Sequence, residues 1–349
     1  MTTGGRDAVL DAVESRRAHI NDALEAELPP AAPERLYEAS RSIIVAGGKR
    51  LRPAMVLLVA EALADVEGPL DAEGYRSFPA LDGTTVDVMA AAVSIEIVHS
   101  FTLIHDDIMD DDEMRRGVPA VHEAYDDATA ILAGDTLYSK GFEILLRTGA
   151  DPERSLAAVR TLAETCTRIC EGQAMDVDFE GRSDVHPDEY TDMIERKTAV
   201  LYAAAAAVPA VVLGADDDTV DALGRYGRAV GQAFQIQDDV LDLTASSETL
   251  GKQRGSDLVE GKRTLITLHA REQGVDVDGL LDADDPEAVT EAEIDEAVAK
   301  LRRAGSIEYA RETAHELVER GKDDLGVLPE NGAHETLAAL ADYLVERGH

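Results

Sequence analysis

The sequence predicts an all-α protein, and three observations lead to that class. Apolar residues recur at i, i+3, i+4 spacing over most of the 349 residues. No segment alternates apolar and polar residues between hairpin turns, as a half-buried strand does. The hydrophobic fraction of 45% is ordinary for a folded protein, and with 4% aromatic residues the core must be built from Leu, Val, Ile and Ala.

Eight segments carry the helical pattern, and Gly, Pro and Asp separate them. In chain order the expected helices cover residues 33–46, 51–64, 86–105, 126–148, 152–175, 188–208, 217–242 and 259–273. Two longer breaks, about 65–86 and 274–290, are acidic and are expected to be solvated inserts. Because no break resembles a flexible linker, residues 1–349 are predicted to form one helical domain.

The compartment follows from three features of the chain. The uncharged stretch 198–215 is long enough to span a membrane, but it is mostly Ala and contains Tyr202 and Pro209. A buried core helix broken at Pro209 is therefore expected. Cys166 and Cys170 lie four residues apart in one helical pattern, which favours buried thiols over a redox pair. Without a signal-peptide pattern at the N-terminus, we expect a cytoplasmic protein with no membrane span.

The net charge excludes one class of partner. The 70 acidic and 33 basic residues give a formal charge of −37, which repels nucleic-acid phosphates and anionic membranes. Only seven of the basic residues are Lys. A surface with many Asp and few Lys suits high salt, where screening removes self-repulsion, so a halophilic source is expected. A mesophilic acidic protein is the alternative.

The first chemical motif is DDIMD, which supplies Asp106, Asp107 and Asp110 at the end of an apolar helix. Asp106 and Asp110 are four residues apart, so they share one helix face about 6 Å from each other. Like charges at this spacing disfavour the helix unless a cation lies between them. Carboxylates are the ligands that Mg²⁺ prefers, with substrate phosphates completing the shell. A solvated acidic helix end is the alternative.

A second DDxxD motif supplies Asp238, Asp239 and Asp242. Its apolar flanks, Phe234 and Leu243 among them, place these carboxylates next to a buried environment. Buried unpaired carboxylates are costly, so a metal or a basic partner is expected. Two such helices facing each other would offer a divalent-metal cage that is open on one side.

Basic residues occur in motifs of their own. In GGKRLRP, Lys49 and Arg52 lie near the start of a helix, which favours anions, although a plain helix–helix turn is the alternative. In RRG, Arg115 and Arg116 follow the first acidic cluster, and charge balance with Asp111 and Asp112 is the alternative. Three further lysines stand in motif-like contexts: Lys197, Lys252 and Lys262. Together these groups imply one diphosphate bound through Mg²⁺ and a second anion bound directly by bases.

The paired DDxxD motifs, GGKRLRP, RRG and GQAFQIQDD, in this order between about residues 34 and 270, resemble the trans-prenyltransferases, or isoprenyl diphosphate synthases. The resemblance implies a helical bundle of the isoprenoid-synthase type around a deep central pocket, and a homodimer. It implies head-to-tail condensation of isopentenyl diphosphate with C5, C10 or C15 allylic diphosphates. It also implies three Mg²⁺ per active site, with Mn²⁺ as a substitute.

The resemblance also assigns roles to residues. Asp106 and Asp110, with Asp107 in support, would bind two Mg²⁺, and Asp238, with Asp239 and Asp242, would bind the third. Bases for the allylic diphosphate are Arg115, Lys197, Lys252 and Lys262. Those for isopentenyl diphosphate are Lys49, Arg52, His99 and Arg116. Thr198 and Gln235 would face the developing carbocation, and Gln173 and Asp176 match the central helix of the family. The alternative for His99 is a core histidine, and no role beyond structure is expected for His105 and His122.

Product length is predicted from the helix that carries the first motif. Phe101 lies five residues before Asp106, hence about 7.5 Å deeper, and could form the pocket floor beside Thr102. Packing between helices is the alternative for Phe101. An aromatic residue here without a two-residue insertion before Arg115 resembles the archaeal geranylgeranyl diphosphate synthases. The main product expected is therefore C20, for isoprenoid ether lipids, with C15 and C25 as alternatives.

Three other functions compete with this one. A terpene cyclase also uses DDxxD but leaves GGKRLRP unexplained, and an inactive homologue would have lost some of the aspartates. A non-enzymatic acidic helical scaffold explains the charge but not the placement of the lysines. Mg²⁺-dependent release of diphosphate from an allylic and isopentenyl diphosphate pair distinguishes all three from the synthase.

Overall fold

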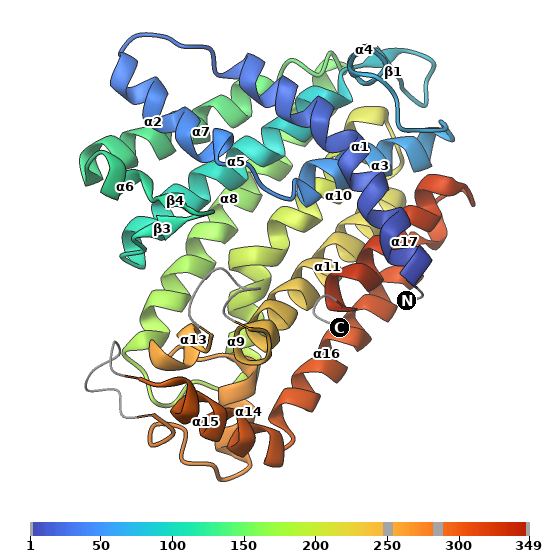
Figure 1. The fold of residues 1–349 in the computed structure, drawn as a ribbon. Coiled ribbons are helices and arrows are strands. Elements are labelled where there is room, and N and C mark those ends of the chain that lie inside the picture. The colour runs from blue at the N-terminus through green and yellow to red at the C-terminus, as the bar shows by residue number, and fades with distance from the viewer. Residues whose placement is uncertain (1–2, 247–253, 282–288, 347–349) are drawn as a thin grey trace.

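The computed structural model describes residues 3–246, 254–281 and 289–346, and it confirms the all-α class (Figure 1). Long helices form the body: α1 (Thr3–Glu27), α2 (Glu34–Val45), α3 (Leu51–Ala64), α5 (Val88–Met109), α7 (Asp127–Leu145), α8 (Pro152–Glu180), α10 (Val200–Leu213), α11 (Asp217–Thr244), α15 (Glu291–Arg303), α16 (Ser306–Asp324) and α17 (Gly332–Glu346). Short helices connect them: α4 (Ala72–Arg76), α6 (Val121–Ala124), α9 (Pro187–Ile194), α13 (Ser256–Val259), α14 (Leu265–Glu272) and the 3₁₀ turn η3 (Leu325–Val327).

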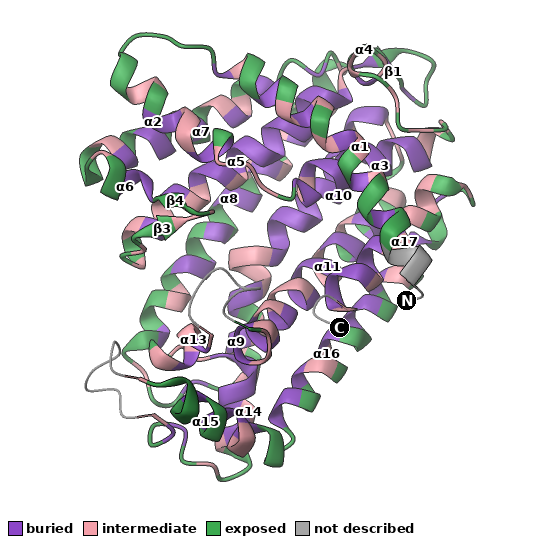
Figure 2. Cartoon of the chain, in the orientation of Figure 1, coloured by how far each residue is buried: buried purple, intermediate pink, exposed green. Residues whose placement is uncertain are grey.

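The core lies between α3, α5, α10 and α11. Helix α10 packs against α11, α3 and α8, and α5 packs against α7 and α3. Every residue of α10 except Val211 is buried, and Figure 2 shows the same for most of α3 and α5. The N-terminal helix α1 contacts α17, so the two ends of the chain lie together.

Aspartate residues begin several of the long helices. Asp87, Asp126 and Asp216 each accept a hydrogen bond from the backbone N–H three residues later, at the starts of α5, α7 and α11. Asp151 does the same for α8, whose first residue is Pro152. These side chains satisfy amide groups that a helix start leaves unpaired. Part of the acidic composition therefore serves the fold itself.

The predicted break at Pro209 is wrong. Helix α10 continues through Pro209 to Leu213, because the packing of a fully buried helix outweighs one missing backbone hydrogen bond. The irregularity lies upstream instead, where Glu195–Ala199 forms a π-helical turn, η1, between α9 and α10. Such turns widen a helix locally and often occur at functional sites.

Several elements fall outside the prediction. Helices α1, α15, α16 and α17 lie beyond the eight segments. In α1, α15 and α16 the apolar residues are diluted by charged ones. The expectation of no strands is wrong for two short antiparallel pairs. In these, β1 (Phe78–Pro79) pairs with β2 (Thr85–Val86), and β3 (Met114–Arg115) pairs with β4 (Val118–Pro119). Strands of two residues are too short to show an alternating pattern.

The insert at 65–86 is not solvated throughout. Tyr75 is fully buried, and its hydroxyl donates to Glu61 Oε1 at 2.5 Å. Glu61 also accepts from buried Arg16, at 2.9 Å from Nε and 2.5 Å from Nη2. This trio ties α1, α3 and the insert helix α4 together. The second insert, 274–290, lies partly outside the described residues.

Two helical stretches, Val88–Met109 and Pro187–Leu213, are long and apolar enough to cross a membrane. In each, 78% of the most apolar window is buried inside the protein. Both are therefore core helices, as predicted for the second.

Candidate active site

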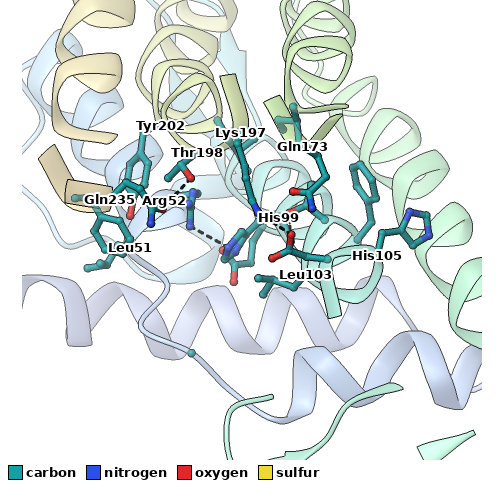
Figure 3. Close-up of a pocket in the computed structure, with 18 of the residues that line it drawn as sticks. Leu51, Arg52, His99, Leu103, His105, Gln173, Lys197, Thr198, Tyr202 and Gln235 are labelled. Atoms are coloured by element: carbon teal, nitrogen blue, oxygen red, sulfur yellow. Dashed lines mark hydrogen bonds and ion pairs between the residues drawn. The ribbon is translucent and has the colours of Figure 1, made fainter. Parts of the chain in front are cut away.

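A cavity of about 1080 Å³ collects most of the predicted site residues (Figure 3). It is lined from α3, α5, α8, α11 and the η1–α10 segment. Predicted residues on its walls are Lys49, Arg52, His99, Phe101, Thr102, Asp106, Arg115, Arg116, Gln173, Lys197, Thr198, Gln235 and Asp238. Asp107, Asp110, Asp176, Asp239, Asp242 and Lys262 lie behind or beside the walls, and Lys252 lies outside the described residues.

Asp106 of the first acidic motif lines this cavity. Lys197 Nζ lies 3.1 Å from Asp106 Oδ1 and 2.5 Å from Asp176 Oδ2. Asp110 caps the end of α5, and burial together with the charge of Asp106 raises its pKa to about 6. Lys262, paired with Glu260 at 2.9 Å, lowers that pKa in part. The crowded carboxylates therefore favour a cation at this end.

Asp107 faces the protein rather than the cavity. It is fully buried and paired with Arg115, and burial raises its pKa to about 6 against the opposing effect of Arg115. Arg115 also pairs with Asp112 at 2.6 Å. The charge-balance interpretation of this arginine therefore holds for Asp112, while the guanidinium still lines the cavity.

The three aspartates of the second acidic motif do not all face the cavity. Asp238 lines the cavity, whereas Asp239 and Asp242 are buried among protein donors. Asp242 accepts from Ser256 Oγ at 2.8 Å and from the Asp257 amide at 3.2 Å. Burial and the charge of Asp257 raise the pKa of Asp239 well above its ordinary value. The partners of these two buried carboxylates include neutral donors, where the sequence predicted a metal or a base.

The donor set fits Mg²⁺ that is shared with a diphosphate. Within the described residues, no three His, Cys, Asp or Glu side chains gather closely enough to hold a metal by themselves. Asp106 from α5 and Asp238 from α11 nevertheless line one cavity. Mg²⁺ in phosphate-handling sites takes one or two protein carboxylates and completes its shell with substrate phosphates and water.

A second group of residues in the cavity wall is basic. Arg52 Nη1 lies 3.0 Å from His99 Nε2, and the guanidinium stacks on Tyr202 with its carbon 4.2 Å from the ring centre. Burial and the charge of Arg52 lower the pKa of His99 to about 4, so His99 is neutral at pH 7. Among the described residues, the buried Nε of Arg52 has no hydrogen-bond partner. This part of the cavity wall therefore offers the positive charge of Arg52 to an anion.

The GGKR loop owes its shape to its glycines. Gly47 and Gly48 have φ of +87° and +147°, which side-chain-bearing residues rarely adopt. A Cβ on Gly48 would press on the Arg116 guanidinium, which donates to the carbonyl oxygens of Ile43 and Gly47. Arg116 therefore braces the loop that carries Lys49.

Buried Arg50 is a residue that the sequence analysis missed. It has φ of +52° and donates to Glu96 at 2.6 Å and to Asn21 at 2.9 Å. The strained backbone of a non-glycine residue within a basic motif is the signal, but only coordinates reveal it.

The π turn carries the polar groups of the central wall. Thr198 Oγ1 donates to Gln235 Oε1 at 3.0 Å, across from η1 to α11 (Figure 3). Any Cβ on Gly172 would collide with the Lys197 backbone, and one on Gly231 would collide with Ala199. Neighbouring helices thus hold this turn by direct backbone contact, a role that the sequence analysis did not assign to these glycines.

Aromatic side chains close the part of the cavity that Phe101 lines, which is called the deep end below. Phe101 is buried, and its ring packs edge-on against Tyr138 at 5.2 Å and His105 at 5.7 Å between ring centres. Tyr138 is 38% exposed, so the support behind Phe101 reaches the surface. Thr102 donates its hydroxyl to the His99 carbonyl at 2.8 Å. The expectation of two buried thiols is wrong for Cys170, which is exposed and lines the cavity, while Cys166 is buried.

Comparison with known proteins places the chain among prenyl-chain enzymes. The polyprenyl synthetase family model matches residues 33–301. A geranylfarnesyl diphosphate synthase of Natronomonas pharaonis is 64% identical, over 98% of this chain and 99% of its own. A geranylgeranyl diphosphate synthase of Methanosarcina mazei is 47% identical, over 97% of this chain and 98% of its own.

Solved structures share the fold. A geranylgeranyl pyrophosphate synthetase from the archaeon Geoglobus acetivorans superposes with a TM-score of 0.84 at 43% identity, covering 96% of this chain and 99% of its own. A polyprenyl synthase from Caulobacter crescentus, solved with calcium and isoprenyl diphosphate, gives a TM-score of 0.82 at 29% identity and covers 98% of each chain.

Proposed function

Since the chain belongs to the polyprenyl synthetase family and is a prenyltransferase that elongates prenyl diphosphates, we propose that the acidic and the basic residues of its cavity wall hold the two diphosphates of a head-to-tail condensation. One observation carries this proposal: acidic Asp106 and Asp238 and basic Lys49 and Arg52 line the same cavity. The acidic residues would take the allylic diphosphate with Mg²⁺. The basic residues would take isopentenyl diphosphate directly.

Each group has a distinct task in the proposed reaction. Asp106, Asp110 and Asp238 would hold Mg²⁺ together with diphosphate oxygens, and the metal would supply positive charge to the departing diphosphate. Lys197 and Arg115 add charge to the same group as the allylic C–O bond ionises. Arg52, Arg116 and neutral His99 orient isopentenyl diphosphate so that its double bond meets the allylic cation. Following the family, we expect three Mg²⁺, with Mn²⁺ as a substitute, and transfer of the final proton to the released diphosphate.

The carbocation needs a water-free but electron-rich surrounding. Gln235 Oε1 and Thr198 Oγ1 lie on the cavity wall, and Phe101, Leu201 and Tyr202 supply apolar surface. Carbonyl and hydroxyl oxygens that face a developing positive charge stabilise it without a covalent bond. Exclusion of water keeps the cation from hydrolysis.

We propose geranylfarnesyl diphosphate (C25) as the main product, in place of the C20 product that the sequence favours. The relative at 64% identity is named for C25, whereas the geranylgeranyl diphosphate synthase of Methanosarcina mazei stands at 47%. Phe101, which lines the cavity, is backed by Tyr138.

The exposed face of α7 is the proposed subunit interface. Ile131, Leu132, Tyr138 and Leu146 are 38–58% exposed, although they are large and apolar. Unpartnered apolar residues on one helix favour a partner, and a second copy of this chain forming a homodimer fits the family. Sedimentation equilibrium tests this, and Leu132→Asp is expected to give monomers. We expect the assembly to act in the cytoplasm.

The decisive experiment for the function is a Mg²⁺-dependent assay. The purified chain, given farnesyl and radiolabelled isopentenyl diphosphate, is expected to release diphosphate and form longer allylic products. A terpene cyclase would release diphosphate without incorporating the label. A scaffold or an inactive homologue would release none, and either result would end this proposal.

A further inference from the structure

Tyr190 is a buried tyrosine attached to the second acidic motif. It lies on α9, one turn before the π turn, and is 2% exposed. Its hydroxyl donates to Asp239 Oδ2 at 2.5 Å. Tyr190 does not line the cavity. Its hydroxyl therefore acts on the motif from behind rather than on a substrate.

A chain of hydrogen bonds leads from Tyr190 to the cavity. The other oxygen of Asp239, Oδ1, accepts from Gln235 Nε2 at 3.1 Å. Gln235 Oε1 in turn accepts from Thr198 Oγ1 at 3.0 Å (Figure 3). Of these four residues, only Gln235 and Thr198 line the cavity.

The donor and acceptor order in this series of hydrogen bonds decides which atom of Gln235 faces the substrate. The two ends of a glutamine amide are nearly the same size, so packing alone does not distinguish them. Both oxygens of Asp239 accept hydrogen bonds, Oδ2 from the Tyr190 hydroxyl and Oδ1 from Gln235 Nε2, so the Gln235 NH₂ group points toward Asp239. The carbonyl oxygen is then left on the side of Thr198 and the cavity.

We propose that Tyr190 is a positioning residue for the condensation: its hydroxyl holds Asp239 in the rotamer that keeps the Gln235 carbonyl oxygen toward the carbocation. Without that hydroxyl, one carboxylate oxygen loses its donor and the Asp239 side chain can rotate. The Gln235 amide can then turn its NH₂ group, which carries partial positive charge, toward a developing positive charge. This inference rests on the proposed function and adds the residue that orients its central polar group.

The chain offers a matched control at Tyr226. This tyrosine is also fully buried, and its hydroxyl donates a single hydrogen bond, to the Leu337 carbonyl at 2.8 Å. It lies on α11, does not line the cavity, and contacts neither Asp239 nor Gln235 through its hydroxyl. Replacing either tyrosine by Phe removes one buried hydroxyl, so both variants share the structural cost.

The test compares Tyr190→Phe with Tyr226→Phe in single-turnover condensation at saturating Mg²⁺ and substrates, so that product release does not mask the chemistry. For Tyr190→Phe we expect the rate to fall about tenfold or more, with KM for both diphosphates unchanged within about twofold. For Tyr226→Phe we expect a lower thermal midpoint with the wild-type rate. Equal rates in the two variants would overturn the inference.

A double variant separates positioning from structure. If Tyr190 acts through Gln235, Tyr190→Phe is expected to cause no further loss of rate in a Gln235→Ala background. If the two substitutions lower the rate by independent factors that multiply, Tyr190 has a separate structural role, and the proposal that it acts through Gln235 is rejected. Should Tyr190→Phe fail to fold, Asp239→Asn replaces it, because an amide no longer imposes one orientation on Gln235, and the same fall in rate is expected. An inactive wild-type enzyme would instead reject the proposed function itself.

Discussion

The Lys197 ammonium lies 3.1 Å from the Asp106 carboxylate, which joins the π turn to the end of α5 across the cavity mouth. Both Asp106 and Asp176 raise the pKa of Lys197 against the effect of its burial, so the lysine is charged. A substrate diphosphate and its metal must therefore exchange partners with an existing ion pair. In the proposed reaction Asp106 would give up Lys197 to hold Mg²⁺, and Lys197 would turn to the diphosphate.

Truncation of the cavity-facing carboxylates tests this arrangement. Asp106→Ala and Asp238→Ala are each expected to lower the condensation rate by about 100-fold or more, since each removes a ligand of the metal that neutralises the leaving group. The far-UV circular dichroism should stay unchanged. Asp323→Ala, an exposed position on α16, serves as the control and should keep the wild-type rate.

Activity is expected to depend on pH through metal binding. The pKa of Asp110 is about 6, raised by burial and then by Asp106. Only the ionised carboxylate binds Mg²⁺, so the Mg²⁺ concentration for half-maximal rate should rise as pH falls below 6, by about tenfold per unit for one displaced proton. Excess Mg²⁺ should restore the rate at pH 5.5, and a Mg²⁺ requirement that is flat from pH 5 to 7 would contradict this.

The same pKa makes a prediction for stability. Because the folded-state pKa of Asp110 is raised above the ordinary 3.8, its contribution to stability is fully present below about pH 4 and is lost as pH rises through about 6. Bound Mg²⁺ offsets this loss. The increase in thermal midpoint on adding Mg²⁺ should therefore be larger at pH 7.5 than at pH 5.

Product length is expected to depend on Phe101. Phe101→Ala removes the ring that closes the deep end, so the mean product should lengthen by at least one C5 unit, measured by chromatography of the dephosphorylated alcohols. Phe142→Ala is the control, because this ring packs on Tyr138 and does not line the cavity. A wild-type enzyme that stops at C20 would restore the original sequence-based prediction.

Salt should stabilise the protein. At a formal charge of −37, self-repulsion is screened over about 10 Å at 0.1 M salt and about 3 Å at 1 M. The thermal midpoint and the rate should both rise between dilute buffer and molar KCl. Equal stability in both would assign the acidity to another cause, such as the many aspartate helix caps.

The buried trio of Glu61, Arg16 and Tyr75 is expected to matter more than any surface pair. Glu61→Ala leaves a buried guanidinium and a buried hydroxyl without their acceptor, so the free energy of unfolding should fall by about 3–5 kcal/mol. Glu143→Ala breaks the exposed pair with Lys140 and should cost less than about 1 kcal/mol. Urea denaturation of the two variants measures the difference.

Sequence reasoning could locate residues where spacing is a direct consequence of chemistry. The DDxxD motifs place Asp106 and Asp238 on two helices, and the structure brings both to one cavity. It was less successful where tertiary contacts decide. Nothing local shows that Asp239 turns away to Tyr190, since the five residues of the motif are alike in charge and spacing to those of the first motif.

The limits of the fold prediction have a similar cause. Pro209 predicts a break by its own chemistry, but the burial of α10 overrides it. Tyr75 looked solvated because its neighbours are acidic, and only the distant Arg16–Glu61 pair explains why it is buried. Long-range partners of this kind leave no periodic pattern in a single sequence.

The backbone contacts at Gly172, Gly227 and Gly231 bear on how such an enzyme can diversify. Each glycine faces the η1–α10 segment so closely that any side chain would collide with it, so this segment is fixed by positions that tolerate no substitution. Near Phe101 the close contacts are to side chains instead of backbone: a Cβ on Gly134 would meet the His105 ring, and one on Gly141 would meet the Val98 side chain. Single substitutions can therefore change the cavity wall around Phe101 while the η1–α10 segment stays in place. Relatives named for C20 and C25 products, both matching nearly the whole of this chain, are the outcome that such a division of labour permits.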